Sequence, residues 1–321
     1  MLFRRPCYFD SFKCTADKCT DNCCIGWEIC IDSDTAEFYK SVDGELGRRL
    51  KENICDGDES SFILKNERCP FLNKNNLCDI ISELGENALC QICRDHPRWF
   101  EWYGNEKEGG IGLSCEEGAR LILTEENFTD YFESECDDLP DEDFEEEAYI
   151  YLLSVRDNIF DILCEENMSF CEKADKILGI CAEAEIKLCG EDRINPPAFD
   201  FDAELKRALP ILGKTEPIDE KWTKEFERLK LCLPVLFPDK DEEKYLTRLT
   251  AYFVWRYFLT SVFDYRVTEK FSFALFSVTV IFALYSISES KSLSVLIKKA
   301  VLYSKQMEYS TENIDIFFLN S

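Results

Sequence analysis

Cysteine is concentrated at one end of this chain, and no other feature constrains the fold as strongly. Residues 13–30 read KCTADKCTDNCCIGWEIC, with five cysteines in eighteen positions. The chain of 321 residues has 18 cysteines, and 12 of them precede residue 116. The first residues, MLFRRPCYFDSFKC, lack the apolar core of a secretory signal, so we expect a cytoplasmic protein. Clustered cysteines in a reducing compartment are typical of metal ligands or redox groups, because structural disulfides are rare there.

The cysteine spacing favours a metal over disulfides. Intervals of two to four residues let neighbouring thiolates turn onto one metal, and later cysteines can close the site across the fold. The adjacent pair Cys23-Cys24 would form only a strained disulfide ring, but it can supply ligands to a cluster. The chain has a single histidine, His96, which excludes a site that needs two. Thiolate-only sites suit zinc or iron–sulfur clusters. Because the cysteines exceed the needs of one tetrahedral zinc, we favour an iron–sulfur cluster and keep zinc as the alternative.

The charge of the chain limits its partners. There are 64 acidic and 37 basic residues, a formal net charge of −27. Such a surface repels nucleic acid, because phosphate binding needs clustered lysine and arginine. It attracts a basic partner or a lysine-bearing substrate, although an acidic surface that only confers solubility is an equally simple reading.

The distribution of apolar residues predicts a mainly α fold. We expect a Cys-rich metal-binding module at residues 1–130 and an α-helical domain at residues 145–321, separated by the acidic run at 133–147. Ser169 and Glu172 have the spacing of a capping box that opens a helix. Residues 271–288 carry no charge, but their length and hydroxyl content favour a buried core helix, so we expect no membrane span. The glycines at 109–112 lack a convincing preceding strand and are weak as a nucleotide-binding loop.

Four motifs carry a resemblance to a known family. The segments FKCTADKCTDNCCIGWEICID, RCPFLNKNNLCDI, LGENALCQICRDHPR and LSCEEGARLIL resemble, in that order, the flagellin lysine-N-methylases and the wider group of Cys-rich zinc- or iron-chelating domains. The match covers about residues 1–125 and continues more weakly through SVRDNIFDILCEENMSFCEKADKIL and YLTRLTAYFVWRYFLTSVFDYR. The resemblance implies that lysines of flagellin are methylated with S-adenosylmethionine as donor, and that an iron–sulfur cluster, of the 4Fe-4S type, is bound. It also implies a ligand set, which is Cys14, Cys19, Cys23, Cys24, Cys69, Cys78, Cys93 and Cys115.

Five further residues lie in or near these motifs but outside the ligand set. Cys30 and Cys90 match the family pattern less securely and are left outside the ligand set. Arg98 is a candidate to bind a sulfur or a cofactor carboxylate, with a surface ion pair as the alternative. Trp27 is expected in the core rather than in contact with substrate. His96 stands where the family more often has an aromatic residue, which puts any role of that ring in doubt.

Two methyl-transfer mechanisms remain open at this stage. In the polar mechanism a neutral lysine amine attacks the sulfonium methyl group, with a carboxylate or tyrosine as the base. In the radical mechanism a reduced cluster cleaves S-adenosylmethionine. Radical enzymes usually have C-x3-C-x2-C, and here Cys19-x3-Cys23 is followed by Gly26 at the third position. The spacing therefore departs from the radical motif, and the sequence identifies no catalytic base.

Two functions from other classes compete with the methyltransferase. One is a non-catalytic metal-binding or chaperone module whose acidic surface captures a basic partner. The other is an electron-transfer or redox-sensing cluster protein.

Overall fold

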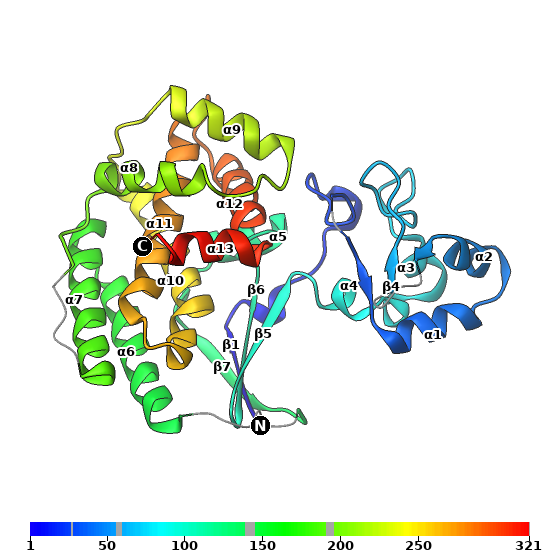
Figure 1. The fold of residues 1–321 in the computed structure, drawn as a ribbon, viewed down its shortest axis with the longest axis horizontal. Helices are drawn as coiled ribbons and strands as arrows, with labels where there is room; N and C mark the ends of the chain where they lie inside the picture. Colours follow the sequence, from blue (N-terminus) through cyan, green and yellow to red (C-terminus); the bar gives the residue numbers. More distant parts are fainter. Residues whose placement is uncertain (27, 56–59, 139–144, 191–195, 321) are drawn as a thin grey trace. The chain divides into compact units, whose positions relative to one another are not determined.

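The computed structural model describes residues 1–26, 28–55, 60–138, 145–190 and 196–320. The chain folds as two compact units, each built from separate stretches of sequence (Figure 1). Unit 1 comprises Met1–Phe12, Phe100–Ser114 and Gly118–Ser321, and unit 2 comprises Lys13–Trp99 and Cys115–Glu117. Each unit has its own hydrophobic core.

Unit 1 is mainly helical, as the sequence predicts. Its helices are α5 (Glu116–Thr124, whose first residues belong to unit 2), α6 (Glu146–Cys164), α7 (Phe170–Cys189), α8 (Phe201–Leu212), α9 (Glu220–Leu231), α10 (Lys240–Tyr257), α11 (Val267–Ser286), α12 (Leu293–Glu308) and α13 (Thr311–Phe318). The predicted capping box is confirmed at the start of α7, where the Ser169 hydroxyl accepts from the backbone N–H of Glu172 and the Glu172 carboxylate accepts from the backbone N–H of Ser169.

The apolar segment around residue 275 forms the central helix of unit 1. Helix α11 is the one helix of the described residues that is long and apolar enough to cross a membrane, yet 78% of its most apolar stretch is buried inside the fold. It packs against α7, α8, α10 and α12. The expectation of a core helix is confirmed, because α11 is covered by protein on nearly all sides.

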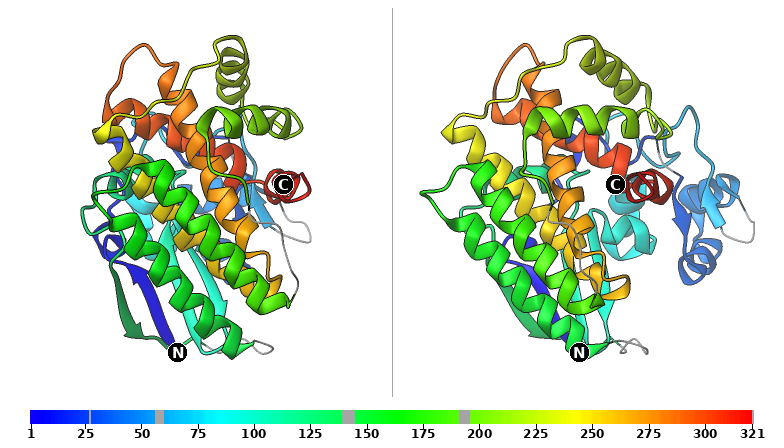
Figure 2. Two further views of the ribbon diagram at one scale, coloured as in Figure 1. Left: turned by 90° about the vertical axis from the view of Figure 1, so that its left-hand side faces the viewer. Right: turned by 60° about the vertical axis from the view of Figure 1, so that its left-hand side comes forward.

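A four-stranded sheet lies beside these helices. Its order is β5-β6-β1-β7, formed by β1 (Leu2–Pro6), β5 (Arg98–Tyr103), β6 (Glu106–Ile111) and β7 (Tyr131–Glu135). Strand β1 runs parallel to β6, with Phe3 opposite Lys107, and antiparallel to β7, with Arg4 opposite Glu133. Helices α6 and α10 cover one face of this sheet (Figure 2): Arg156 of α6 bonds Glu108, and the Trp255 indole of α10 donates to the Gly109 carbonyl at 3.1 Å.

The division of the chain differs from the expected boundary between residues 130 and 145. Residues 1–12 and most of residues 100–135 fold with the helices rather than with the Cys-rich module. The physical reason is strand pairing, because β1 finds both of its partners in β6 and β7, far along the sequence. Part of the acidic run expected as a boundary, residues 139–144, lies outside the described residues.

Unit 2 is smaller and has short elements. It contains helices α1 (Ser33–Ser41), α2 (Gly44–Glu52), α3 (Asp79–Leu84) and α4 (Gln91–Asp95), and a three-stranded sheet in the order β2 (Cys30–Ile31), β4 (Ser60–Phe62), β3 (Ile54–Cys55). Asp32 organises two of these elements, because one carboxylate oxygen caps α1 at Thr35 and the other accepts from the backbone N–H of Gln91 at 2.8 Å. Much of the remaining described backbone of unit 2 is loop and turn.

Candidate metal centre

Five cysteines of unit 2 gather at its core, whereas Cys14, Cys23, Cys30 and Cys55 are exposed. Cys69 and Cys90 are buried, and Cys24, Cys78 and Cys93 pack against the same apolar cluster. This cluster includes the rings of Tyr39, Phe62 and Phe71 together with aliphatic side chains from α1, α2 and α3. Four separate stretches of sequence therefore bring thiols to one apolar environment.

Local backbone bonds fix where these thiols lie. The backbone N–H of Cys69 donates to the Cys24 carbonyl at 2.9 Å, which joins the first cysteine motif to the CPFL step. Cys78 forms a β-bridge with Leu72, just before α3 begins. Cys90 precedes the first residue of α4, and its carbonyl accepts from the Arg94 N–H.

Two pairs of thiols interact directly. Cys24 is hydrogen-bonded to Cys23, and Cys93 to Cys90. In each pair this hydrogen bond is the main reason that the pKa of Cys24 or Cys93 is raised, followed by burial and by the nearby thiols, which include Cys69 for both. The same bond from Cys93 lowers the pKa of Cys90, because it stabilises the Cys90 thiolate.

Burial and mutual repulsion oppose full ionisation of the group. Burial raises the pKa of Cys69 to about 11, with Cys78 and Cys90 adding to the effect among nearby groups. A second thiolate in such a group is unfavourable unless a cation compensates the charge. A bound metal would supply that compensation and displace the protons, so metal binding by these thiols is expected to strengthen as the pH rises.

A second group of predicted ligands is tied to the start of α5. Cys19 lies near Cys14 and Cys23, and its thiol donates to the Asp21 carbonyl at 3.3 Å. The Glu116 carboxylate accepts from the backbone N–H of Thr20 at 2.8 Å and from the Thr20 hydroxyl. These bonds hold the Cys19 loop against the residue that follows Cys115.

The eight predicted ligands, Cys90 and Cys30 differ in their surroundings in the structure. Among the described residues, no three Cys, His, Asp or Glu side chains form a group that could hold a metal ion as they stand, so the eight-cysteine ligand set remains a prediction. Cys90, which sequence comparison left outside that set, is a buried member of the thiol group. The C-x2-C spacing of Cys90 and Cys93 is a local signal that indicates such a position. Cys30 is exposed on β2.

Arg98, Trp27 and the glycines at 109–112 were also considered from the sequence. Arg98 is half-buried at the start of β5, and its role as a cofactor ligand stays a prediction. Trp27 lies outside the described residues. The glycine-rich segment at 109–112 begins within strand β6 rather than in a loop. A Cβ at Gly109 would lie 2.9 Å from the Phe3 ring and 3.0 Å from the Phe100 ring, so this glycine permits close packing of aromatic rings.

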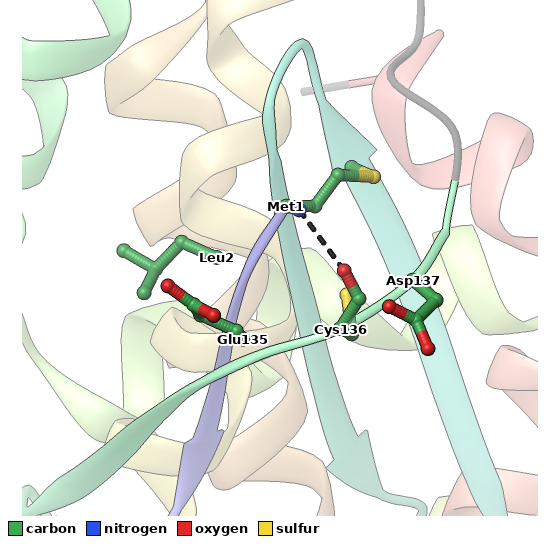
Figure 3. Close-up of a pocket in the computed structure, with 5 residues that line it drawn as sticks. All are labelled: Met1, Leu2, Glu135, Cys136 and Asp137. Carbon is green, nitrogen blue, oxygen red and sulfur yellow. Dashed lines mark hydrogen bonds between the residues drawn. The ribbon is translucent and has the colours of Figure 1, made fainter.

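A surface pocket occurs where β1 begins and β7 ends. It is lined by Met1, Leu2, Glu135, Cys136 and Asp137, and the Met1 ammonium donates to the Cys136 carbonyl at 3.0 Å (Figure 3). None of the predicted ligands lines this pocket, so we assign it no part in the metal centre.

Known proteins that match the chain come from flagellar biology and lysine methylation. The flagellar biosynthetic protein FliU of Salmonella muenchen is 30% identical over 128 residues, which cover 37% of this chain and 76% of that protein. The lysine-N-methylases of Salmonella typhimurium and Salmonella choleraesuis are also 30% identical over 128 residues, but there the match covers 32% of the relative's length. No family model and no solved structure matches the chain.

Proposed function

The chain belongs to the family of the FliU protein and the flagellin lysine-N-methylases, and on this premise we propose that it is a protein-lysine N-methyltransferase acting on flagellin. The observation that carries the proposal is the 30% identity to proteins named lysine-N-methylase. Because the match spans about a third of the lysine-N-methylases' length, the activity of the whole chain is inferred rather than read from the relatives. We place the reaction in the cytoplasm, where thiols stay reduced.

The thiol group of unit 2 supports a prosthetic metal. Cys24, Cys69, Cys78 and Cys93, joined by Cys90, would hold an iron–sulfur cluster, with zinc as the alternative. Such a cluster, when bound, supplies one-electron chemistry or a Lewis-acidic iron near the methyl donor. In the polar mechanism the protein must hold the acceptor amine neutral and in line with the methyl group of S-adenosylmethionine.

The charge of the chain is consistent with a lysine-bearing substrate. A net charge of −27 raises the local concentration of basic segments and accelerates their encounter with the protein. Methyl transfer then breaks the donor's sulfur–carbon bond, forms the nitrogen–carbon bond and releases a proton from the lysine amine. We assign no residue as the base.

The test is a methyl-transfer assay with anaerobically purified protein. S-adenosylmethionine with an isotope-labelled methyl group is incubated with flagellin, and peptide mass spectrometry locates the label. We expect label on lysine side chains, and iron and sulfide in the purified protein with a brown colour. A protein that binds metal but neither binds S-adenosylmethionine nor labels any lysine supports the metal-binding module instead. Stoichiometric zinc without iron would rule out the radical mechanism.

A further inference from the structure

The two faces of the four-stranded sheet differ in character. The helix-covered face carries charged groups in buried pairs, such as Glu108 with Arg156. Side chains alternate along a strand, so neighbours of Glu108 point away from the helices. On that outer face, Phe3 of β1 lies opposite Lys107 of β6, and Phe100 of the neighbouring edge strand β5 packs against Phe3 with 6.1 Å between ring centroids.

The Lys107 ammonium lies over three aromatic rings at once. Its Nζ atom is 4.3 Å from the centroid of Phe100, 4.8 Å from that of Trp102 and 5.6 Å from that of Phe3. The Asp138 carboxylate forms an ion pair with the same Nζ atom. Three rings and one carboxylate thus surround a single ammonium group.

Phe9 and Gly109 determine how the rings pack, and Trp102 is exposed to water. Phe9 is buried and packs edge-on against Phe3 at 5.8 Å and against Phe100 at 6.3 Å. Gly109 has no side chain to separate Phe3 from Phe100. Trp102 is 37% exposed and the Asp138 side chain 41% exposed, so a ligand would approach the cluster from the side of these two residues.

We propose that Phe3, Phe100, Trp102 and Asp138 form a binding site for a methylated lysine side chain of a partner protein, and that Lys107 occupies this site when no ligand is bound. Aromatic rings attract cations through their negative faces, and sets of rings recognise methylated ammonium groups. A mono- or dimethylated lysine fits these four groups, because its methyl groups contact the rings while a remaining N–H donates to Asp138. The inference rests on the proposed function for the source of the methylated lysine, namely the product of the reaction.

Methylation favours the ligand over Lys107. An unmethylated ammonium is strongly hydrated, and enclosing it among rings removes water that the rings do not replace. A methylated ammonium loses less hydration and gains contact area. Lys107 is tethered on a flexible four-carbon stem, so it can swing into solvent when a better cation arrives. While Lys107 occupies the rings the ligand cannot bind, so the apparent affinity for methylated lysine falls in proportion to the time that Lys107 spends there.

The test measures binding directly and needs no methyl transfer, so its failure is distinct from failure of the enzymatic proposal. The variant Lys107→Ala removes the ammonium from the three rings and leaves the Arg5 guanidinium, 5.3 Å from the Phe3 centroid; Lys107→Thr, which suits a strand, is the second variant should alanine disturb folding. Dimethyllysine with blocked termini is titrated by calorimetry, with the unmethylated compound in parallel. The matched control is Lys187→Ala, because Lys187 lies over a single ring, Tyr151, at 3.6 Å.

We expect Lys107→Ala to bind the dimethylated compound about tenfold more tightly than the unmethylated one. Wild type should bind it more weakly than Lys107→Ala, and adding Trp102→Ala to Lys107→Ala should remove the preference. The Lys187→Ala control should behave as wild type. Equal affinity for both compounds, no binding to either folded Lys107 variant, or preference retained without Trp102 would each overturn the proposal.

Discussion

The buried pair of Arg156 and Glu108 gives the sharpest prediction about stability. The guanidinium donates to both carboxylate oxygens at 2.7 Å, and the two side chains are 0% and 1% exposed. The guanidinium carbon also lies 4.3 Å from the centre of the Trp255 ring. Replacing Arg156 with methionine keeps much of the volume but leaves a carboxylate buried without its cation.

The expected loss follows from that burial. Removing one member of a buried ion pair destabilises a protein by about 3–5 kcal/mol, since the remaining charge is left uncompensated. For domains of about 150–250 residues each kcal/mol lowers the melting temperature by about 2–4 °C, so Arg156→Met should melt about 6–20 °C below wild type. This is a large share of a typical free energy of unfolding of about 5–15 kcal/mol.

The measurement is urea unfolding followed by far-ultraviolet circular dichroism, which reports the long helices of unit 1. The double variant Glu108→Leu with Arg156→Met should recover most of the loss, because no charge is then buried alone. The exposed pair of Lys224 and Glu220 serves as a control, and Lys224→Ala should cost at most about 0.5 kcal/mol. If Arg156→Met costs less than about 1 kcal/mol, or if the double variant is no better than the single one, the reasoning is refuted.

Three further predictions concern the metal, a helix start and the aromatic face. Cys24→Ser should lower the iron or zinc content of the purified protein, measured by elemental analysis. Cys232 is exposed, and Cys232→Ser should leave the metal content unchanged. Equal metal content in the two variants would remove Cys24 from the predicted ligand set. Ser169→Ala should lower the free energy of unfolding by about 1 kcal/mol at neutral pH. Hydrogen bonds from the Ser169 backbone and side chain lower the pKa of Glu172 below its ordinary 4.5. The capping contribution should therefore be present above pH 4.5 and be lost as the pH falls through the lowered pKa. If the difference in free energy of unfolding between wild type and Ser169→Ala does not change in acid, this explanation is wrong. Gly109→Ala should destabilise unit 1 by about 1–3 kcal/mol, because the new methyl group would displace packed rings, and a neutral effect in the same urea assay would show that the rings can move.

The sequence predicts the helical half of the chain well because its signals are local. The capping residues Ser169 and Glu172 and the uncharged run in α11 act within a few turns of helix, and both are confirmed in the structure.

The sheet and the division into units were not predictable in this way. Strand β1 carries two arginines and pairs with strands about a hundred residues away, so no nearby pattern reveals it. The glycines at 109–112 are weak as a nucleotide-binding loop, and the rings of Phe3 and Phe100 supply the reason for Gly109, which no local pattern reveals. Burial of Cys90 likewise depends on how α1, α3 and α4 meet, which spacing alone cannot specify.

The insertion of unit 2 between β1 and β5 has a consequence for the order in which the protein assembles during synthesis. Arg4 and Glu133 form an ion pair across 129 positions, so β1 waits unpaired until most of the N-terminal half has left the ribosome. The thiols from Cys14 to Cys93 are all made in the interval, before β1 has a partner strand. Cys115 follows β6 by only a few residues. Cys115, the last of the predicted ligands, is therefore made just after β6 and before β7, so β1 gains its parallel partner ahead of its antiparallel one.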